Sequence, residues 1–301
     1  MADDIPAAAG RKSFSEALGE SFWLSAIWIG LVVLVTLTAE LWPLAEYDRM
    51  DFNRPAAPPG TEISAPLEGE PAKEGKKVYL LGTDTMGRDI LSRLIFGART
   101  SLTVGLTTPC IGMVIGGILG MLGGFYRGWV ERIIVAVMDA ILAFPGLVLL
   151  LAITFILGRG LGNIILALGV LTVPAFARVA RATTLRYAQL EFVQSARMLG
   201  QSDIDILARE ILPNVLWSLL VYGLLVVSYM IVAEGALSFL GLGVPAPTPS
   251  WGGMIAEGKE VLDEAPHVSL IPALVMFLTV LSFNLMGDCL RQAIDGKEEQ
   301  L

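Results

Sequence analysis

The chain has 301 residues, 54% of them hydrophobic, and its mean hydropathy is +0.66. This composition excludes a single long soluble core, and the net charge of −8 gives no indication of nucleic-acid binding. About 20 apolar residues cross the hydrocarbon core of a bilayer. Apolar runs of roughly that length lie at residues 22–42, 100–123, 133–157, 161–177, 215–240 and 270–290. We therefore predict an all-α, polytopic integral membrane protein with about six transmembrane helices.

The first run, residues 22–42, follows a tail of residues 1–21 that we expect in the cytoplasm. It has no clear small-residue cleavage site, so it resembles an uncleaved span rather than a signal peptide. The loop of residues 43–99 comes next. Its stretch 54–77 is rich in proline, glycine and charge, so we expect it to be extended or mobile rather than packed.

A charged cluster of Asp84, Arg88 and Asp89 ends this loop, between the turn-forming residues Gly82 and Gly87. An acid–base site would need a nucleophile nearby, and the local sequence supplies none. We therefore interpret the cluster as a hydrogen-bonded turn at the outer membrane face. Contact between this turn and an external binding protein is a hypothesis.

Glycines recur every four residues in the second run, at Gly112, Gly116, Gly120 and Gly124. On a helix they form one stripe that lets another backbone approach closely, and such packing drives helix association in lipid. The stripe predicts a tight helix–helix seam, either within this subunit or with a partner. The alternative is the general enrichment of glycine in transmembrane helices.

Three prolines, Pro109, Pro145 and Pro174, lie in or near the spans and are expected to kink them, because each removes a backbone donor. The polar residues 158–163 predict a tight turn between the third and fourth spans. Cys110 and Cys289 both fall inside apolar runs and are expected to be packing residues.

Charges inside apolar runs are costly and are therefore functional candidates. Asp139 is interpreted as a solvated acid near the membrane interface, and Asp288 is expected to pair with Arg291 at the inner surface. Glu234 either lines the translocation path or bonds the turn that follows it. The single histidine, His267, cannot form a histidine-rich metal site and is interpreted as a surface residue.

The orientation follows from basic residues in short loops. The loop of residues 178–214 carries five arginines, whereas the loop of residues 241–269 carries only Lys259, so the first is placed in the cytoplasm and the second outside. Both termini, including the tail 291–301, are then cytoplasmic. The loop 43–99 disagrees, because its eight basic residues are then external, but it is near the length at which the rule weakens.

Residues 191–214 are polar but have helical periodicity. Phe192, Ala196 and Leu199 form one apolar face, and Gly200 can end this first helix in the left-handed conformation. Ser202 with Asp205 resembles a capping box that starts a second helix.

The second helix is expected to bury one apolar face and to end at Pro213, where the fifth span opens. The residues of that face are Ile204, Leu207, Ala208 and Ile211. The pair of helices is either a docking surface for another protein or an amphipathic element that lies on lipid.

This segment resembles the cytoplasmic "EAA" loop in permease subunits of ATP-binding-cassette (ABC) importers, with its pattern Glu-Ala-Ala, a glycine and a final Ile-X-Leu-Pro. Ser195, Ala196, Gly200, Leu212 and Pro213 match this pattern. Two positions depart from it, since Gln194 replaces the first glutamate and Glu210 replaces the isoleucine. Any role for a charge at position 194 is therefore in doubt.

Further segments are similar to the dipeptide/oligopeptide permeases, in particular their C-type subunit. They are residues 81–102, 233–243, 247–252 and 284–288, so the resemblance covers roughly residues 80–295. It implies the type I permease fold in the cytoplasmic membrane, with a transmembrane core at residues 100–290. It also implies import of peptides or similar solutes, with nickel complexes left open.

The resemblance further implies a homologous permease as partner, two ATPase subunits that bind ATP and magnesium, and an extracytoplasmic solute-binding protein. The chain itself has no Gly-x-x-x-x-Gly-Lys-Ser/Thr loop, so ATP hydrolysis is assigned to the partners. The residues expected to couple to them are Glu191, Gln194, Ser195, Ala196, Arg197, Gly200, Asp203, Arg209 and Pro213. The alternatives are a stand-alone ion-coupled carrier or channel, and a membrane-embedded enzyme, which would require a cluster of catalytic acids or histidines.

Overall fold

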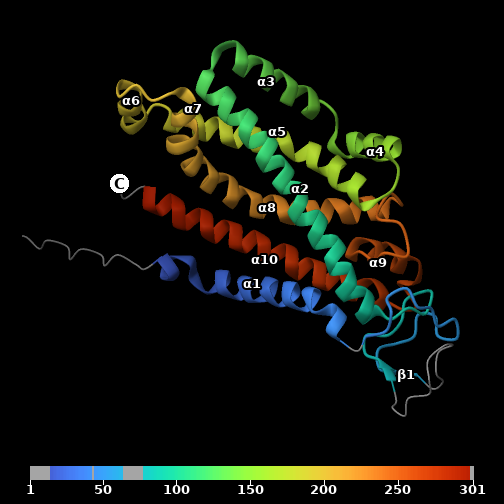
Figure 1. The fold of residues 1–301 in the computed structure, drawn as a ribbon. Helices are drawn as coiled ribbons and strands as arrows, with labels where there is room; N and C mark the ends of the chain where they lie inside the picture. The colour runs from blue at the N-terminus through green and yellow to red at the C-terminus, as the bar shows by residue number, and fades with distance from the viewer. Residues whose placement is uncertain (1–13, 43, 64–76, 299–301) are drawn as a thin grey trace, which may run out of the picture.

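The computed structural model describes residues 14–42, 44–63 and 77–298, and these are mainly helical (Figure 1). The ten α-helices are α1 (Phe14–Leu37), α2 (Ile90–Tyr126), α3 (Gly128–Leu142), α4 (Gly146–Leu157), α5 (Leu161–Tyr187), α6 (Glu191–Met198), α7 (Asp203–Asp205), α8 (Leu212–Phe239), α9 (Trp251–Gly258) and α10 (His267–Glu298). Short 3₁₀ turns follow α1 and α9, and a π-helical segment, Ile206–Ile211, joins α7 to α8.

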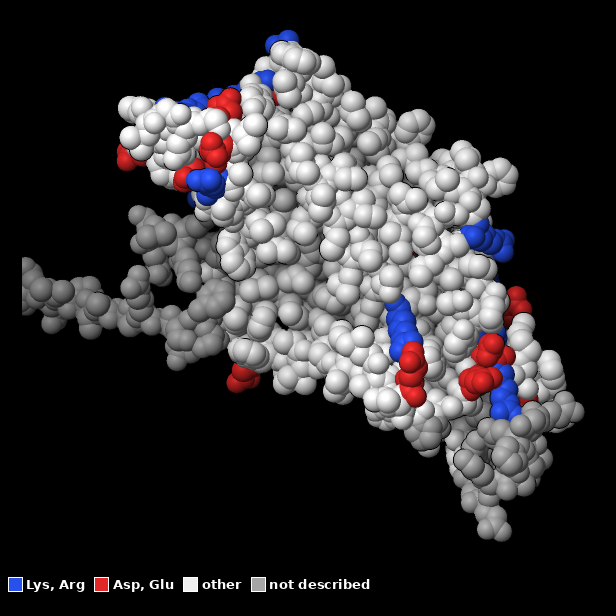
Figure 2. Space-filling model, viewed as in Figure 1, with Lys and Arg blue, Asp and Glu red and all other residues white. Residues whose placement is uncertain are grey.

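Five helical stretches among the described residues are long and apolar enough to cross a membrane, and a sixth is obtained if α3 and α4 count as one span. The five are Leu18–Leu37, Ile90–Tyr126, Leu161–Tyr187, Asp203–Phe239 and His267–Ala293. Figure 2 shows that charged side chains gather at the two ends of the visible face, with a largely uncharged surface between them. The prediction of an all-α polytopic membrane protein is confirmed.

The third predicted span, residues 133–157, is not one straight helix. α3 and α4 meet at an angle of 84°, and Pro145 is the residue that precedes α4. Its predicted kink is thus a complete break, because a residue before proline is driven out of the helical region. Pro109 and Pro174 do not break α2 and α5, which run through them without interruption.

Several helices extend beyond the apolar runs, and α2 and α5 are two of them. Asp89 caps the start of α2 by accepting from the backbone N–H groups of Leu91 and Ser92, so α2 begins ten residues before residue 100. α5 continues to Tyr187, so the first part of the predicted loop 178–214 is helix. The expected turn between the third and fourth spans is present, and Gly158 has a φ of 81° there.

The glycine stripe of α2 packs against α5. A Cβ atom at Gly116 would lie 2.4 Å from the carbonyl oxygen of Val173, and one at Gly120 would lie 2.3 Å from that of Ala177. A Cβ atom at Gly124 would lie 2.8 Å from the carbonyl oxygen of Arg181, whereas one at Gly112 would meet the side chains of Thr172 and Phe176. The stripe is therefore a seam within this subunit, where two backbones are in contact.

The largest apolar cluster lies among α2, α5, α6 and α8. Its fully buried members include Val104, Phe176, Ile211 and Val215. On the opposite side of the bundle α1 runs along α10, and the side chain of Trp28 donates a hydrogen bond to the Thr279 hydroxyl at 3.1 Å. Figure 1 shows α6 at the same end as the last turns of α10, while α9 and the strands lie at the other end.

The ends of the proline-rich stretch 54–77 are ordered, contrary to the prediction. β1 (Thr61–Ile63) and β2 (Lys77–Tyr79) form an antiparallel pair in which Glu62 lies opposite Val78. The intervening residues 64–76 lie outside the described residues, as do residues 1–13 of the predicted tail. His267 is also not a free surface residue, because its Nε2 lies 3.0 Å from the carbonyl oxygen of Ala57 and so joins this loop to α10.

Candidate functional site: a helical protrusion and an ion network

The helix α6 ends at Gly200 as expected. Gly200 has a φ of 77°, which favours glycine, and its N–H donates to the carbonyl of Arg197 at 3.0 Å. The N–H of Gln201 donates to the carbonyl of Ala196 at 3.2 Å. Together these two bonds form a Schellman motif, so Gly200 determines where α6 stops and how the chain turns.

Ser202 caps the second helix as predicted, but the reciprocal bond differs from that of a capping box. The Ser202 hydroxyl accepts from the backbone N–H of Asp205 at 3.2 Å, and the Asp205 carboxylate accepts from that hydroxyl at 2.6 Å rather than from the Ser202 backbone. The helix that starts here does not end at Pro213. It continues through the π-helical segment into α8, so Asp203–Phe239 is one helical stretch.

The wider π turn explains how the helix passes Pro213. The N–H of Leu212 bonds the carbonyl of Leu207, five residues back, so the register changes just before proline removes a donor. The Asn214 side chain then donates to the carbonyl of Glu210 at 2.7 Å. A side-chain donor thus satisfies a carbonyl near the proline.

The apolar faces predicted for this segment are partly wrong. In α6 Ala196 is buried as expected, but its buried partner is Val193, whereas Phe192 and Leu199 are exposed. In the second helix Ile206 and Ile211 are buried, whereas Ile204 and Ala208 are exposed. The reason is that packing of the two helices against each other and against the bundle, rather than apolar spacing within the segment, decides which side of each helix is covered.

Residues 191–213 thus form a protrusion, and apolar side chains at its tip are exposed to solvent. Met198 is 83% exposed, Leu199 82% and Ile204 75%. Most residues predicted to couple to partners are exposed on the same protrusion, namely Glu191, Gln194, Ser195, Arg197, Gly200, Asp203, Arg209 and Pro213. Ala196 differs from these, because it is buried against the bundle.

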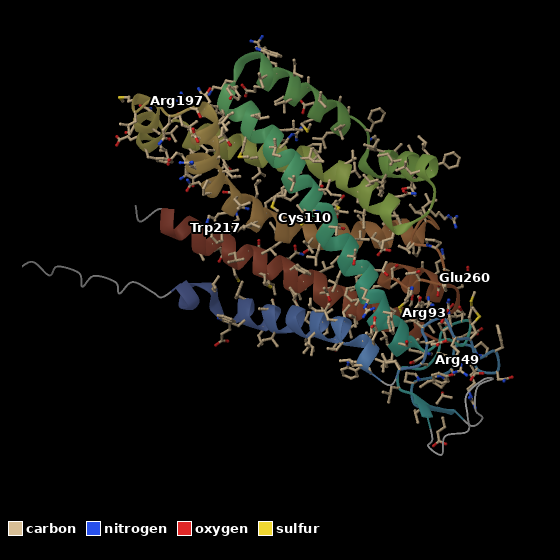
Figure 3. All side chains as sticks on the ribbon, viewed as in Figure 1. Arg49, Arg93, Cys110, Arg197, Trp217 and Glu260 are labelled. Carbon is tan, nitrogen blue, oxygen red and sulfur yellow. The ribbon has the colours of Figure 1, made fainter. Side chains whose placement is uncertain are left out.

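Arg197 points back toward its own chain. Its guanidinium carbon lies 4.9 Å from the centre of the Phe125 ring, at the end of α2 (Figure 3). Arg209 lies near Asp205, with 3.8 Å between nitrogen and oxygen, and both side chains are largely exposed. Such an exposed pair contributes little to stability.

Glu234 is fully buried in α8 and bonds the turn that follows it, as one of the two sequence interpretations expects. One carboxylate oxygen accepts from the hydroxyls of Ser238 and Ser250 at 2.8 Å each, and the other faces the Ser101 hydroxyl at 3.5 Å. The side chain reaches no open surface in this conformation. The other interpretation, a residue that lines the path, therefore receives no support.

The outer charged cluster is larger than the sequence indicates. The Arg88 Nε donates to Asp84 at 2.6 Å, and its Nη2 donates to Glu257 at 2.6 Å. Arg93 also contacts Glu257 at 3.1 Å and Asp84 at 3.2 Å. Sequence reasoning missed Arg93 and Glu257, since the early start of α2 and the position of α9 bring them to the cluster. The hydrogen-bonded turn predicted at Asp84 is present, and it is part of an ion network that joins the loop before α2 to α2 and α9.

Two groups beside this network have shifted pKa values. Burial raises the pKa of Asp89, and the N–H groups of Leu91 and Ser92 partly oppose this effect. Burial, together with the nearby carboxylates of Asp51 and Asp89, raises the pKa of Tyr79 to about 12. Both groups therefore belong to a packed outer region rather than to a solvated loop.

The helix α3 is attached to α5 by ion pairs. Arg178 donates to Asp139 at 2.8 Å, and Arg181 donates to Glu131. Asp139 is thus a solvent-exposed acid as predicted, but it has a partner. Asp288 is exposed on α10, and its pairing with Arg291 stays a prediction. Cys110 is exposed rather than packed, and Cys289 is partly covered.

A bundle of membrane-spanning helices with a structured protrusion at one end is the architecture of a transporter's membrane component. Residues 112–299 match the family described as "Binding-protein-dependent transport system inner membrane component". This match covers more than half of the chain, and the chain therefore belongs to that family.

Curated relatives agree with the match. A glutathione transport system permease protein GsiD from Pectobacterium atrosepticum is 40% identical over 275 residues, which cover 90% of this chain and 87% of that protein. The protein of the same name from Escherichia coli is 46% identical over 219 residues, covering 73% and 72% respectively. The chain is accordingly a multi-pass inner-membrane permease subunit of an ABC importer of the peptide type.

Solved structures support the fold. The MetNI methionine ABC transporter in inward-facing conformations has a chain that matches with a TM-score of 0.56 and 19% identity, covering 68% of this chain and 97% of that chain. At this identity the likeness concerns the type I permease fold alone. As a binding-protein-dependent permease, the chain works with ATPase subunits and a solute-binding protein, and a stand-alone carrier or channel receives no support.

Proposed function

We propose that the protrusion of residues 191–213 is the surface that docks on an ATPase subunit, and that its movement drives import of peptide-like solutes. The main observation behind this proposal is the exposure of apolar side chains at the tip of the protrusion. Met198, Leu199 and Ile204 are each at least three-quarters exposed on short helices outside the bundle. Contiguous exposed apolar side chains with a polar surround are typical of a protein interface.

The alternative, an amphipathic element on the lipid surface, fits these residues less well. An interfacial helix separates an apolar face toward lipid from a charged face toward water. Here the exposed residues Gln194 and Asp203 share the tip with Met198 and Ile204. Mixed apolar and polar side chains suit a protein partner, which can satisfy both kinds of group.

The orientation of the chain follows from this docking role. ATP-hydrolysing subunits work in the cytoplasm, so the end of the bundle that carries α6 is the cytoplasmic end. The last turns of α10 lie at that end, and α9 lies at the other (Figure 1). We infer that both termini are cytoplasmic, in agreement with the five arginines of residues 178–214.

For partners, we infer a homologous permease that completes the translocation path, two ATPase subunits that hold ATP and magnesium, and an extracytoplasmic binding protein that selects the solute. The chain itself is inferred to be non-catalytic. The names of the relatives point to glutathione, a tripeptide, within the peptide class expected from the sequence. We infer that this chain transports glutathione or short peptides of similar size.

The docking proposal is tested at Gly200. A valine there would impose a β-branched side chain on a φ of 77°, so the turn after α6 would be strained although the space is open. Gly200→Val is expected to reduce the ATPase subunits that co-purify with the chain and to abolish ATP-dependent uptake of labelled glutathione into proteoliposomes.

Gly241→Val is the matched control, because Gly241 has a φ of 79° and equally open surroundings at the opposite end of the bundle. This control should keep the ATPase subunits bound. Unchanged ATPase binding and uptake in Gly200→Val would refute the docking surface. ATP-dependent uptake of another solute, with glutathione excluded, would refute the substrate assignment and leave the docking assignment intact.

A further inference from the structure

The helix α6 presents two different faces. Phe192, Met198 and Leu199 are exposed on the side away from the bundle, whereas Val193 and Ala196 are buried. The buried pair belongs to the same apolar cluster as Phe125 of α2. One short helix therefore has an outward surface for a partner and an inward surface that touches the membrane-spanning bundle.

Arg197 lies between these two faces, because its side chain is exposed but its guanidinium contacts the bundle. The guanidinium carbon lies 4.9 Å from the centre of the Phe125 ring. A guanidinium is attracted to the face of an aromatic ring, and the attraction depends on their relative position. The apolar contacts of Val193 and Ala196 hold α6 against the bundle. The contact between guanidinium and ring fixes the position of α6 relative to the end of α2.

Phe125 is well placed to receive a movement. It lies in the last turn of α2, next to Gly124, whose Cβ position is 2.8 Å from the carbonyl oxygen of Arg181. Gly120, one turn earlier, is in similar contact with the backbone of Ala177. Since α2 and α5 are in backbone contact here, a movement of the α2 end is transmitted to α5.

The other connection of α6 leads to α8. The chain passes through the Gly200 turn, the three residues of α7 and the π-helical segment Ile206–Ile211, and α6 also packs directly against that segment. A π segment is a frequent site of local adjustment in a helix. The contact with Phe125 is thus the connection from α6 to the end of α2, and the α8 side is the adjustable one.

We propose that Arg197 is a positioning residue that transmits movement of α6 to α2 and α5 through Phe125, and that it is not a docking contact for the ATPase subunit. This inference rests on the proposed function of the protrusion. It divides α6 by role: the bare side chains Met198 and Leu199 bind the partner, and Arg197 fixes how the bundle responds. Loss of Arg197 should therefore separate binding from coupling.

The test uses the whole transporter in proteoliposomes and compares three quantities: co-purified ATPase subunits, ATP hydrolysis, and uptake. Arg197→Met keeps a long side chain but removes the cation. It should leave the amount of bound ATPase unchanged and lower uptake per ATP hydrolysed by about two- to fivefold, the effect expected from one exposed cation–π contact. Arg197→Lys keeps a cation and should recover most of the coupling.

Variants of the ring complete a double-mutant cycle. Phe125→Leu keeps apolar bulk and should lower coupling as Arg197→Met does, and adding Arg197→Met to it should cause no further loss. Phe125→Tyr keeps the ring and should stay coupled. Arg132→Met is the matched control, because Arg132 is an exposed arginine on α3 near the end of α2 and lies outside the protrusion.

Two results would overturn the inference. If Arg197→Met releases the ATPase subunits, Arg197 is a docking contact. If it lowers coupling equally in the Phe125→Leu background, the effect does not pass through Phe125. Both results leave the proposed function intact, whereas that function fails separately if Gly200→Val has no effect on ATPase binding or uptake.

Discussion

Glu234 shows how a charged residue is accommodated inside the bundle. Three serine hydroxyls from three elements point at its carboxylate, and two of them also organise the start of α9. The Ser250 hydroxyl accepts from the N–H of Gly253, and the Ser101 hydroxyl accepts from the N–H of Trp251. The carboxylate therefore holds α9 against α2 and α8. A buried acceptor of this kind stabilises the fold most when all its hydrogen-bond donors are present.

Replacing this acceptor tests its structural role. Glu234→Leu keeps a similar volume but leaves three hydroxyls without their acceptor, so we expect a loss of about 1–3 kcal/mol in stability. The measurement is the melting temperature of the purified protein in detergent. Glu260→Leu is the matched control on the exposed surface nearby and should change little. Equal melting temperatures for the two variants would contradict the role of Glu234.

At the scale of elements, the seam between α2 and α5 is the most constrained contact. Gly120 approaches the backbone of Ala177, and a backbone cannot move aside as a flexible side chain can. Gly117, on the same helix, would place a Cβ atom 3.1 Å from a methyl group of Leu219, which can adjust. Two glycines of one helix thus have very different tolerance for a methyl group.

Gly120→Ala is expected to destabilise the protein by about 1–3 kcal/mol or more, because the added methyl separates α2 from α5. Gly117→Ala should be neutral or slightly stabilising, since alanine favours the helix by up to about 1 kcal/mol over glycine. Thermal unfolding of both variants in the same detergent measures the difference. A Gly120→Ala protein as stable as Gly117→Ala would show that the seam is looser than described.

Local chemistry predicted the element ends around the protrusion with mixed success. The ends at Gly200 and Ser202 were predictable, because a left-handed glycine and a capping serine act within a few residues. The faces of the two helices were not, since Val193 rather than Phe192 meets the α2 end. Pro213 was also misleading, because a π turn before it removes the need for the helix to stop.

For the whole molecule, both ends of the bundle carry charge, but they differ in construction. One end has the protrusion with its exposed apolar side chains, whereas the other end has the ion network of Arg88, Arg93, Asp84 and Glu257. The docking proposal places the first of these ends in the cytoplasm. The orientation can be measured directly.

In a background with Cys110 and Cys289 replaced by alanine, single cysteines at Glu260 and Gln292 probe the two ends. Both positions are exposed. In right-side-out membrane vesicles a membrane-impermeant maleimide should label Glu260→Cys but not Gln292→Cys, and both should react after the vesicles are opened. Labelling of Gln292→Cys in closed vesicles would reverse the proposed orientation.

The sequence by itself determined the class of this protein. Apolar runs of about 20 residues form helices in lipid, because a helix satisfies its backbone hydrogen bonds within one segment whereas an open sheet leaves its edges unpaired. Local motifs indicated the permease family and the turn at Gly200. Tertiary structure decided what depends on residues far apart in the chain. It brought Glu257 to Arg88, turned Arg197 onto Phe125 and joined the glycine stripe to α5. Such contacts depend on how helices pack side by side, which periodicity within one helix does not specify.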